Sequence, residues 1–186
     1  MANEVQITDN VVTGDVIGRD KHVTIHPSAK TTAYLEGLYK KFLEEVKTAE
    51  ERLFIDDLQH YTSQASGDVL GLEEKLKAGN RGEILWYAKD LKERYHKKLI
   101  RTSQFSMVAQ KINLHLLTLI RTNYLTEIYP MIVERKEKAI IDNLINEKIV
   151  KPLLTELGEN CLEFNADHIL GMVYYLTGNC HIKWTE

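Results

Sequence analysis

The chain has 186 residues and a formal net charge of -3, and 44% of its residues are hydrophobic. This composition is typical of one globular domain with a core and argues against disorder. The small negative charge argues against a protein that mainly coats nucleic acid. No apolar run approaches the roughly 18 residues of a membrane span. The N-terminus lacks the basic start and apolar stretch of a signal peptide, so we expect a cytoplasmic protein.

Residues 1–28 predict a small β segment that is distinct from the rest of the chain. Val, Ile and Thr recur there with a period near two, and turn-forming residues separate the short runs. So small a sheet is marginal in water by itself, so we expect it to pair with another sheet edge, in the same chain or in a second copy. The predicted homo-oligomer contacts are Val5, Ile7, Val11, Val16, Ile17, Val23 and Ile25.

Residues 29–186 predict a helical interaction domain, so the expected fold class is mainly α: a multi-helix bundle with the N-terminal β segment and a short C-terminal strand. Apolar residues recur three and four positions apart through most of this range. Gly79 is expected to close a short helix, and the next helix should begin near residues 81–83. Pro130 should end or kink a long helix, whereas Pro152 should lie in a first helical turn.

The closing segment predicts a capped helix followed by the C-terminal strand. Asn165 is a good N-cap, and Gly178 stands where a left-handed C-cap is expected. Cys180, Ile182 and Trp184 then alternate with polar residues, as in a half-buried strand. We therefore expect this apolar end to dock into the body of the protein or onto a partner.

No complete catalytic, metal or cofactor motif is present, so we predict a protein that is not an enzyme and binds neither metal nor cofactor. The glycines of residues 14–21 lack the spacing of a phosphate-binding loop. The two cysteines and the histidines near them lack the paired spacing of zinc ligands, and buried thiols are the better interpretation. A small enzyme would need side chains from distant positions to converge in one pocket.

One helix carries a dense basic face formed by Arg94, Lys97, Lys98 and Arg101. Their three- and four-residue spacing places them on one side of the helix, where a nucleic-acid strand could lie. The simpler interpretation is a solvated face that balances the acidic Glu83, Asp90 and Glu93. Nucleic-acid binding is therefore an alternative function and not the favoured one.

Two parts of the chain resemble proteins of bacterial conflict systems. The turns of the β segment, with Gly14, Asp15, Gly18, Arg19, Asp20 and Lys21, are similar to a short motif that precedes signalling and oligomerisation modules. Residues 71–80 and the closing residues Gly178, Asn179, Cys180, His181 and Trp184 resemble a C-terminal domain of the ABC-three-component systems, which include the Lamassu type.

This resemblance implies a non-catalytic role in an anti-phage defence complex. The family domain is expected to link an effector, often a nuclease or a protease, to an SMC-like ABC ATPase and to other components of the same locus. No effector domain precedes the β motif in this sequence. The chain is therefore expected to be a stand-alone partner, to work with a separately encoded effector, or to be an excised domain. The resemblance implies no catalytic residue.

Overall fold

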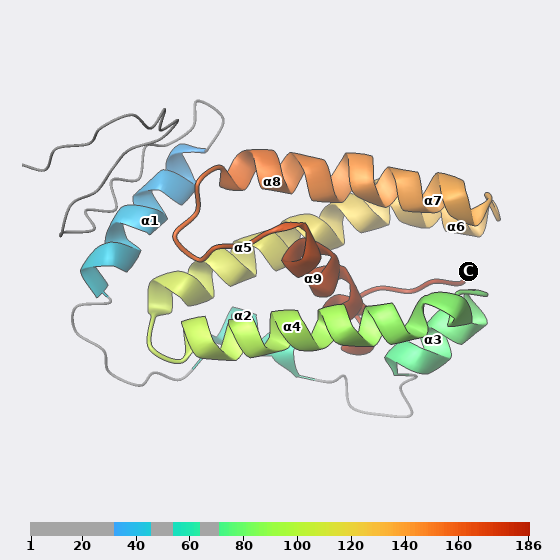
Figure 1. Ribbon diagram of the computed structural model, residues 1–186, viewed down its shortest axis with the longest axis horizontal. Helices are drawn as coiled ribbons and strands as arrows, with labels where there is room; N and C mark the ends of the chain where they lie inside the picture. The colour runs from blue at the N-terminus through green and yellow to red at the C-terminus, as the bar shows by residue number, and fades with distance from the viewer. Residues whose placement is uncertain (1–31, 46–53, 64–70) are drawn as a thin grey trace, which may run out of the picture.

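The computed structural model describes residues 32–45, 54–63 and 71–186 (Figure 1). The strands predicted in residues 1–28, with their self-association residues and turns, lie outside the described residues. Within the described residues the fold is mainly α, as the sequence predicts, and contains no strand.

The chain forms a succession of helices with short connections. In chain order they are α1 (Ala33–Glu45), α2 (Asp56–Thr62), α3 (Leu72–Ala78), the 3₁₀ turn η2 (Gly82–Ile84), α4 (Leu85–Ser103), α5 (Met107–Asn123), the π turn η3 (Tyr124–Ile128), α6 (Tyr129–Val133), α7 (Lys138–Ile145), the π turn η4 (Asn146–Val150), α8 (Lys151–Leu157) and α9 (Ala166–Gly178).

Two long helical rods and α4 frame the domain, and α9 crosses between them (Figure 1). The first rod is α5 with η3 and α6, and the second is α7 with η4 and α8, which returns alongside it. The most extensive helix contact is between α4 and α9, whereas α1 and α2 pack on α5. The apolar helix faces predicted from the sequence therefore pack into one core that all the long helices share.

Both prolines within the described residues follow a π turn. Pro130 lies at the start of α6, directly after η3, and Pro152 lies at the start of α8, directly after η4. Proline lacks the N–H of a helical hydrogen bond and its ring collides with the preceding turn, and a wider π turn makes room for it. The rod is thus interrupted one turn before Pro130 and then continues, while Pro152 occupies the predicted first turn.

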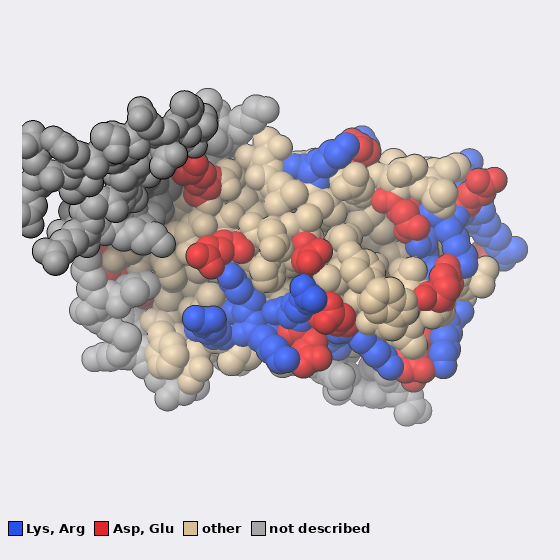
Figure 2. Space-filling view, viewed as in Figure 1, with Lys and Arg blue, Asp and Glu red and all other residues tan. Residues whose placement is uncertain are grey.

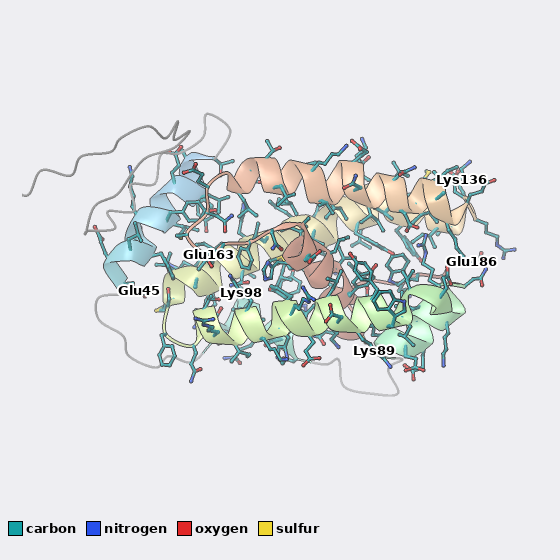
Figure 3. All side chains as sticks on the ribbon, in the orientation of Figure 1. Glu45, Lys89, Lys98, Lys136, Glu163 and Glu186 are labelled. Atoms are coloured by element: carbon teal, nitrogen blue, oxygen red, sulfur yellow. The ribbon has the colours of Figure 1, made fainter. Side chains whose placement is uncertain are left out.

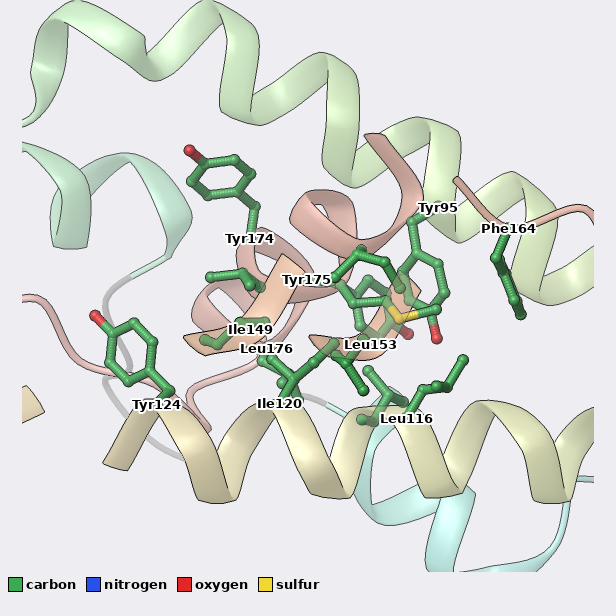
Figure 4. Close-up of a cluster of buried hydrophobic side chains, with 14 of the residues drawn as sticks. Tyr95, Leu116, Ile120, Tyr124, Ile149, Leu153, Phe164, Tyr174, Tyr175 and Leu176 are labelled. Atoms are coloured by element: carbon green, nitrogen blue, oxygen red, sulfur yellow. The ribbon is translucent and has the colours of Figure 1, made fainter. Parts of the chain in front are cut away.

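The core gathers large apolar side chains from α4, α5, η4, α8 and α9 (Figure 4). The Tyr95 ring meets the Tyr175 ring edge-on at 5.2 Å between centroids. The Tyr95 hydroxyl donates to Asn113 Oδ1 at 3.1 Å, and Asn113 in turn donates to the Ala109 carbonyl. These bonds satisfy polar groups that would be costly to bury alone, and burial raises the pKa of Tyr95 well above its ordinary value.

The predicted C-terminal strand is wrong, although its pattern of burial is right. The residues after α9 run as an irregular chain in which Ile182 and Trp184 are buried and Lys183 is exposed. A strand needs a partner ladder, and among the described residues none lies beside this segment. The Tyr124 hydroxyl instead donates to the Lys183 carbonyl at 2.9 Å.

The left-handed residue that ends α9 is Cys180, and the prediction of Gly178 for this position is wrong. Gly178 still belongs to the helix, whereas Cys180 has a φ of 71°. The His181 N–H donates to the Leu176 carbonyl at 2.8 Å and the Cys180 N–H to the Thr177 carbonyl at 3.2 Å, which is a Schellman turn. The Lys92 side chain packs closely over Gly178, so a Cβ there would displace its ammonium group.

Candidate functional site

The two stretches that carry the family resemblance meet in space. Gly79, at the end of α3, lies so close to the closing segment that a Cβ on it would stand 2.7 Å from Trp184 Cβ. Lys75 Nζ donates to the Thr177 carbonyl at 2.7 Å. Its charge complements the negative end of the α9 dipole. The closing segment is therefore fixed against α3, some hundred residues earlier in the sequence.

Trp184 is held from several sides and is only 4% exposed. Its indole N–H donates to Thr177 Oγ1 at 3.0 Å, and the Arg81 guanidinium carbon lies 5.1 Å from its ring centroid. The Tyr124 ring packs edge-on against it at 5.6 Å. The expectation that this end docks into the body of the protein is confirmed.

A cavity of about 430 Å³ opens beside Trp184, where α3 ends, α6 ends and α7 begins; we call it the cationic pocket. Its charged lining consists of Arg81, Arg135, Lys136, Lys138 and Glu186. Arg81 is nearly buried and binds Asp142 and the Lys138 carbonyl. Blue atoms with some red among them gather at this end of the molecule (Figure 2). The sequence gives no local signal for this pocket, because its residues are far apart in the chain.

The predicted basic face does form a single groove, of about 420 Å³. Arg94, Lys97, Lys98 and Arg101 line it together with residues at the start of α9 (Figure 2). Three of the four cations lie near carboxylates: Arg94 lies 2.8 Å from Asp90, Lys97 lies 2.6 Å from Glu93, and Lys98 lies 3.9 Å from Glu163. Among the described residues, no carboxylate lies within 4 Å of Arg101. The face is thus close to charge balance.

The start of α9 borders the basic groove and carries a capping box. Asn165 Oδ1 accepts from the His168 N–H at 3.1 Å, and His168 Nδ1 accepts from the Asn165 N–H at 3.3 Å. This second bond requires an unprotonated Nδ1. Burial, followed by the charge of Lys98, lowers the pKa of His168.

An apolar groove of about 290 Å³ lies between α4, α7, η4 and α9; we call it the tyrosine groove. Tyr87 and Tyr174 line it together with Leu170, Ile145 and Val150. The Trp86 ring lies 5.7 Å from the Tyr87 ring and is 74% exposed. The sequence could have indicated this exposure, since Trp86 stands on the opposite side of its helix from Ala88, Leu91 and Tyr95.

The candidate metal and thiol residues do not form a metal centre. Among the described residues, no three His, Cys, Asp or Glu side chains gather. Cys161 is a free thiol whose pKa burial raises to about 12, which makes it unreactive. The His60 and His181 rings contact each other at a tilt, with their centroids 4.9 Å apart, and in the described part of the chain His181 Nε2 has no hydrogen-bond partner. Burial lowers the pKa of His181.

No helix in the described ranges is both long and apolar enough to cross a membrane.

The family model for C-terminal domain 9 (CTD9) of the ABC-three-component (ABC-3C) systems matches residues 71–184. Neither a curated protein nor a solved structure is detectably similar to the chain. The match begins just before α3 and ends at Trp184, so it spans the whole unit that the Gly79–Trp184 contact closes. The chain therefore belongs to the CTD9 family and is a component of an ABC-3C anti-phage defence system.

Proposed function

We propose that the protein is a non-catalytic interaction and assembly module that links an effector to an SMC-like ABC ATPase of its defence complex. The family match supports a partner within the same system. The observation that carries the proposal is the exposed Trp86 beside the tyrosine groove. Because the Trp86 ring neighbours Tyr87 of the groove, the two extend one exposed aromatic surface, and such surfaces mark interaction sites in which Trp is enriched among the residues that dominate binding energy.

The surroundings of Trp86 have the composition of an interface centre. Tyr87 and Tyr174 provide aromatic surface, and Leu170, Ile145 and Val150 provide an apolar base. Two exposed ion pairs lie nearby: Lys89 of α4 pairs with Glu73 of α3, and Asp90 pairs with Arg94 within α4. An apolar centre with a charged rim is the usual anatomy of a protein interface. The proposed ATPase contact is a side chain or helix that fills the groove and covers Trp86.

The test is a pull-down of the ABC ATPase from cells that carry the whole locus. Trp86→Ala should weaken capture by about 30-fold, the loss expected when a hot-spot aromatic is truncated. Phe105→Ala is the matched control, because Phe105 is also an exposed aromatic but follows the C-terminal end of α4, whereas Trp86 lies at its start. Equal capture by wild type and Trp86→Ala would remove the groove from the proposal. Failure of the wild type to capture the ATPase would refute the linking role.

Nucleic-acid binding at the basic groove is a second candidate, favoured by the convergence of all four cations in that groove. Because the neighbouring carboxylates cancel much of the charge, we expect weak binding that falls steeply with salt. Arg101→Ala should reduce a gel shift at low salt, and no shift with wild type would exclude this candidate.

A further inference from the structure

The cationic pocket has a size and lining unlike those of an ordinary surface hollow. Its volume of about 430 Å³ lies within the range of about 300–1,000 Å³ that small-molecule sites occupy. Buried Ile132, Ile141 and Trp184 form its apolar base. Four cations and one carboxylate form its charged lining. This combination suits a ligand with a flat or apolar body and a strongly anionic group.

Helices α3 and α6 each end in a turn that brings a cation, Arg81 or Arg135, to the pocket. α3 ends in a Schellman turn with Asn80 at a φ of 55°, and Arg81 follows directly. α6 ends in the same way, with Arg135 itself at a φ of 57°. Non-glycine residues rarely adopt this conformation, and it persists where the surrounding structure imposes it. The positions of Arg81 and Arg135 are therefore set by the backbone as well as by their side chains.

The most exposed cation of the pocket, Arg135, is already paired with a carboxylate. Arg135 donates through both Nε and Nη2 to Glu186 Oε1. Figure 3 labels Lys136 and Glu186, which lie at this end of the molecule. Both partners are mostly exposed, at 81% for Arg135 and 58% for Glu186. Exposed ion pairs contribute little to stability, so a stronger anion can displace Glu186 at small cost.

The two lysines of the pocket, Lys136 and Lys138, are also held only by exposed ion pairs, so they too can bind an anionic ligand. Lys138 binds Glu83 at 2.7 Å and Lys136 binds Glu134 at 3.2 Å, and each of these pairs is about half exposed. Neither glutamate lines the pocket. A phosphate group has three acceptor oxygens and up to two charges, so it can engage Arg135, Lys136 and Lys138 together more strongly than one carboxylate.

We propose that the cationic pocket binds a small phosphorylated ligand, a nucleoside phosphate by its chemistry, and that Glu186 occupies the phosphate position when the ligand is absent. The phosphates would contact Arg135, Lys136 and Lys138, and the body would lie over Ile132 and Ile141. This site is separate from the tyrosine groove, so it can be tested independently of the proposed function.

The experiment is calorimetric titration of the full chain with ADP, pyrophosphate and adenosine at an ionic strength of about 0.05 M. ADP should bind saturably with one ligand per chain, and adenosine should bind much more weakly. Arg135→Gln should weaken ADP binding by about tenfold, the usual cost of one charge-assisted hydrogen-bonding group. Glu186→Gln should tighten it several-fold, because it removes the competing carboxylate. The control is Arg121→Gln, which changes an exposed arginine on α5 and should bind ADP as tightly as wild type does.

Two comparisons decide the result. ADP binding tighter than pyrophosphate identifies a nucleoside phosphate, and equal affinities identify the phosphate group as the recognised part; both support the site. No saturable binding by either the wild type or Glu186→Gln would overturn the proposal. So would equal ADP affinities for Arg135→Gln, Glu186→Gln and wild type. An acidic peptide that binds more tightly than both phosphates would overturn it in favour of a protein partner.

Discussion

At the scale of single residues, the two tryptophans of the chain have opposite environments. Trp184 is buried with its N–H bonded to Thr177, whereas Trp86 is almost fully exposed. Removing a buried aromatic side chain loses its burial energy and leaves a cavity, but removing an exposed ring does neither. Comparing alanine substitutions at the two residues therefore measures how much the buried Trp184 side chain contributes to the free energy of unfolding.

We predict that Trp184→Ala lowers the free energy of unfolding by about 3–5 kcal/mol, as truncation of a buried aromatic does. Trp86→Ala should stay within about 0.5 kcal/mol of wild type, as surface substitutions do. Urea denaturation followed by circular dichroism measures both. Equal stabilities of the two variants would mean that the Trp184 ring does not stabilise the domain.

Residue-level features were predictable where a local rule fixes them. Asn165 caps α9 as expected, because an N-cap needs only its own side chain and the next turn. The left-handed Cys180 was not predictable, because the general preference for glycine pointed to Gly178. Gly178 lies two residues earlier, within the helix, where the Lys92 side chain packs against it.

At the scale of elements, α4 and α9 approach each other closely at Gly171. A Cβ on this residue would overlap the Leu91 carbonyl oxygen and stand 2.9 Å from Tyr95 Cβ. Both neighbours belong to the buried face of α4, so neither can move without shifting the helix. The crossing of the two helices therefore depends on a missing side chain.

We predict that Gly171→Ala destabilises the domain by about 1–3 kcal/mol through overpacking. Gly37→Ala is the matched control in helix α1, where nothing lies within 4 Å of the new Cβ. It should stabilise the protein by up to about 1 kcal/mol, because alanine favours the helix. Thermal unfolding of the two variants should shift in opposite directions, and a shift in the same direction would contradict the close crossing.

The cap of α9 predicts a specific pH dependence. The pKa of His168 is lowered by burial and by Lys98, so the unfolded chain binds this proton more readily than the folded one. The contribution of His168 is therefore complete above about pH 6.5 and is lost as the pH falls through the lowered folded-state pKa. His168→Gln keeps a capping-box acceptor but cannot titrate.

Urea denaturation at about pH 7.5 and pH 5 should thus show a smaller acid loss of stability for His168→Gln than for wild type. At the higher pH the two proteins should be equally stable, which controls for damage to the cap. Identical losses on acidification would show that His168 does not contribute to the pH dependence.

Helices were predictable from the sequence because their apolar periodicity is local. The π turns before Pro130 and Pro152 were not, since a proline predicts an interruption but not its form. The C-terminal strand failed for a different reason. Alternating burial looks the same whether a segment pairs with a strand or lies irregularly against helices, as Ile182 and Trp184 do.

At the scale of the whole molecule, self-association through the N-terminal segment stays a prediction. Deleting residues 5–26 should leave the helical domain folded, because the CTD9 match and the described core begin later in the chain. Light scattering should show a mass that falls toward that of a monomer. An unchanged mass with retained helical circular dichroism would refute assembly through these residues.

Whether a site could be predicted from the sequence depends on how many separate segments of the chain form it. The basic groove was predictable because its four cations lie within eight residues of one helix. The cationic pocket takes residues from α3, α6, α7 and the closing segment, and each of those segments has an ordinary sequence. Only the fold brings Arg81, Arg135 and Glu186 to one cavity.

The contact between Gly79 and Trp184 also has a consequence for synthesis on the ribosome. α3 is made early, but the surface it offers to Trp184 stays uncovered until about a hundred further residues have been translated. A nascent chain therefore carries an exposed apolar site during most of its elongation, and such surfaces attract chaperones or promote aggregation. A released chain that stops before residue 184 should accordingly be much less resistant to protease than the released chain that includes Trp184.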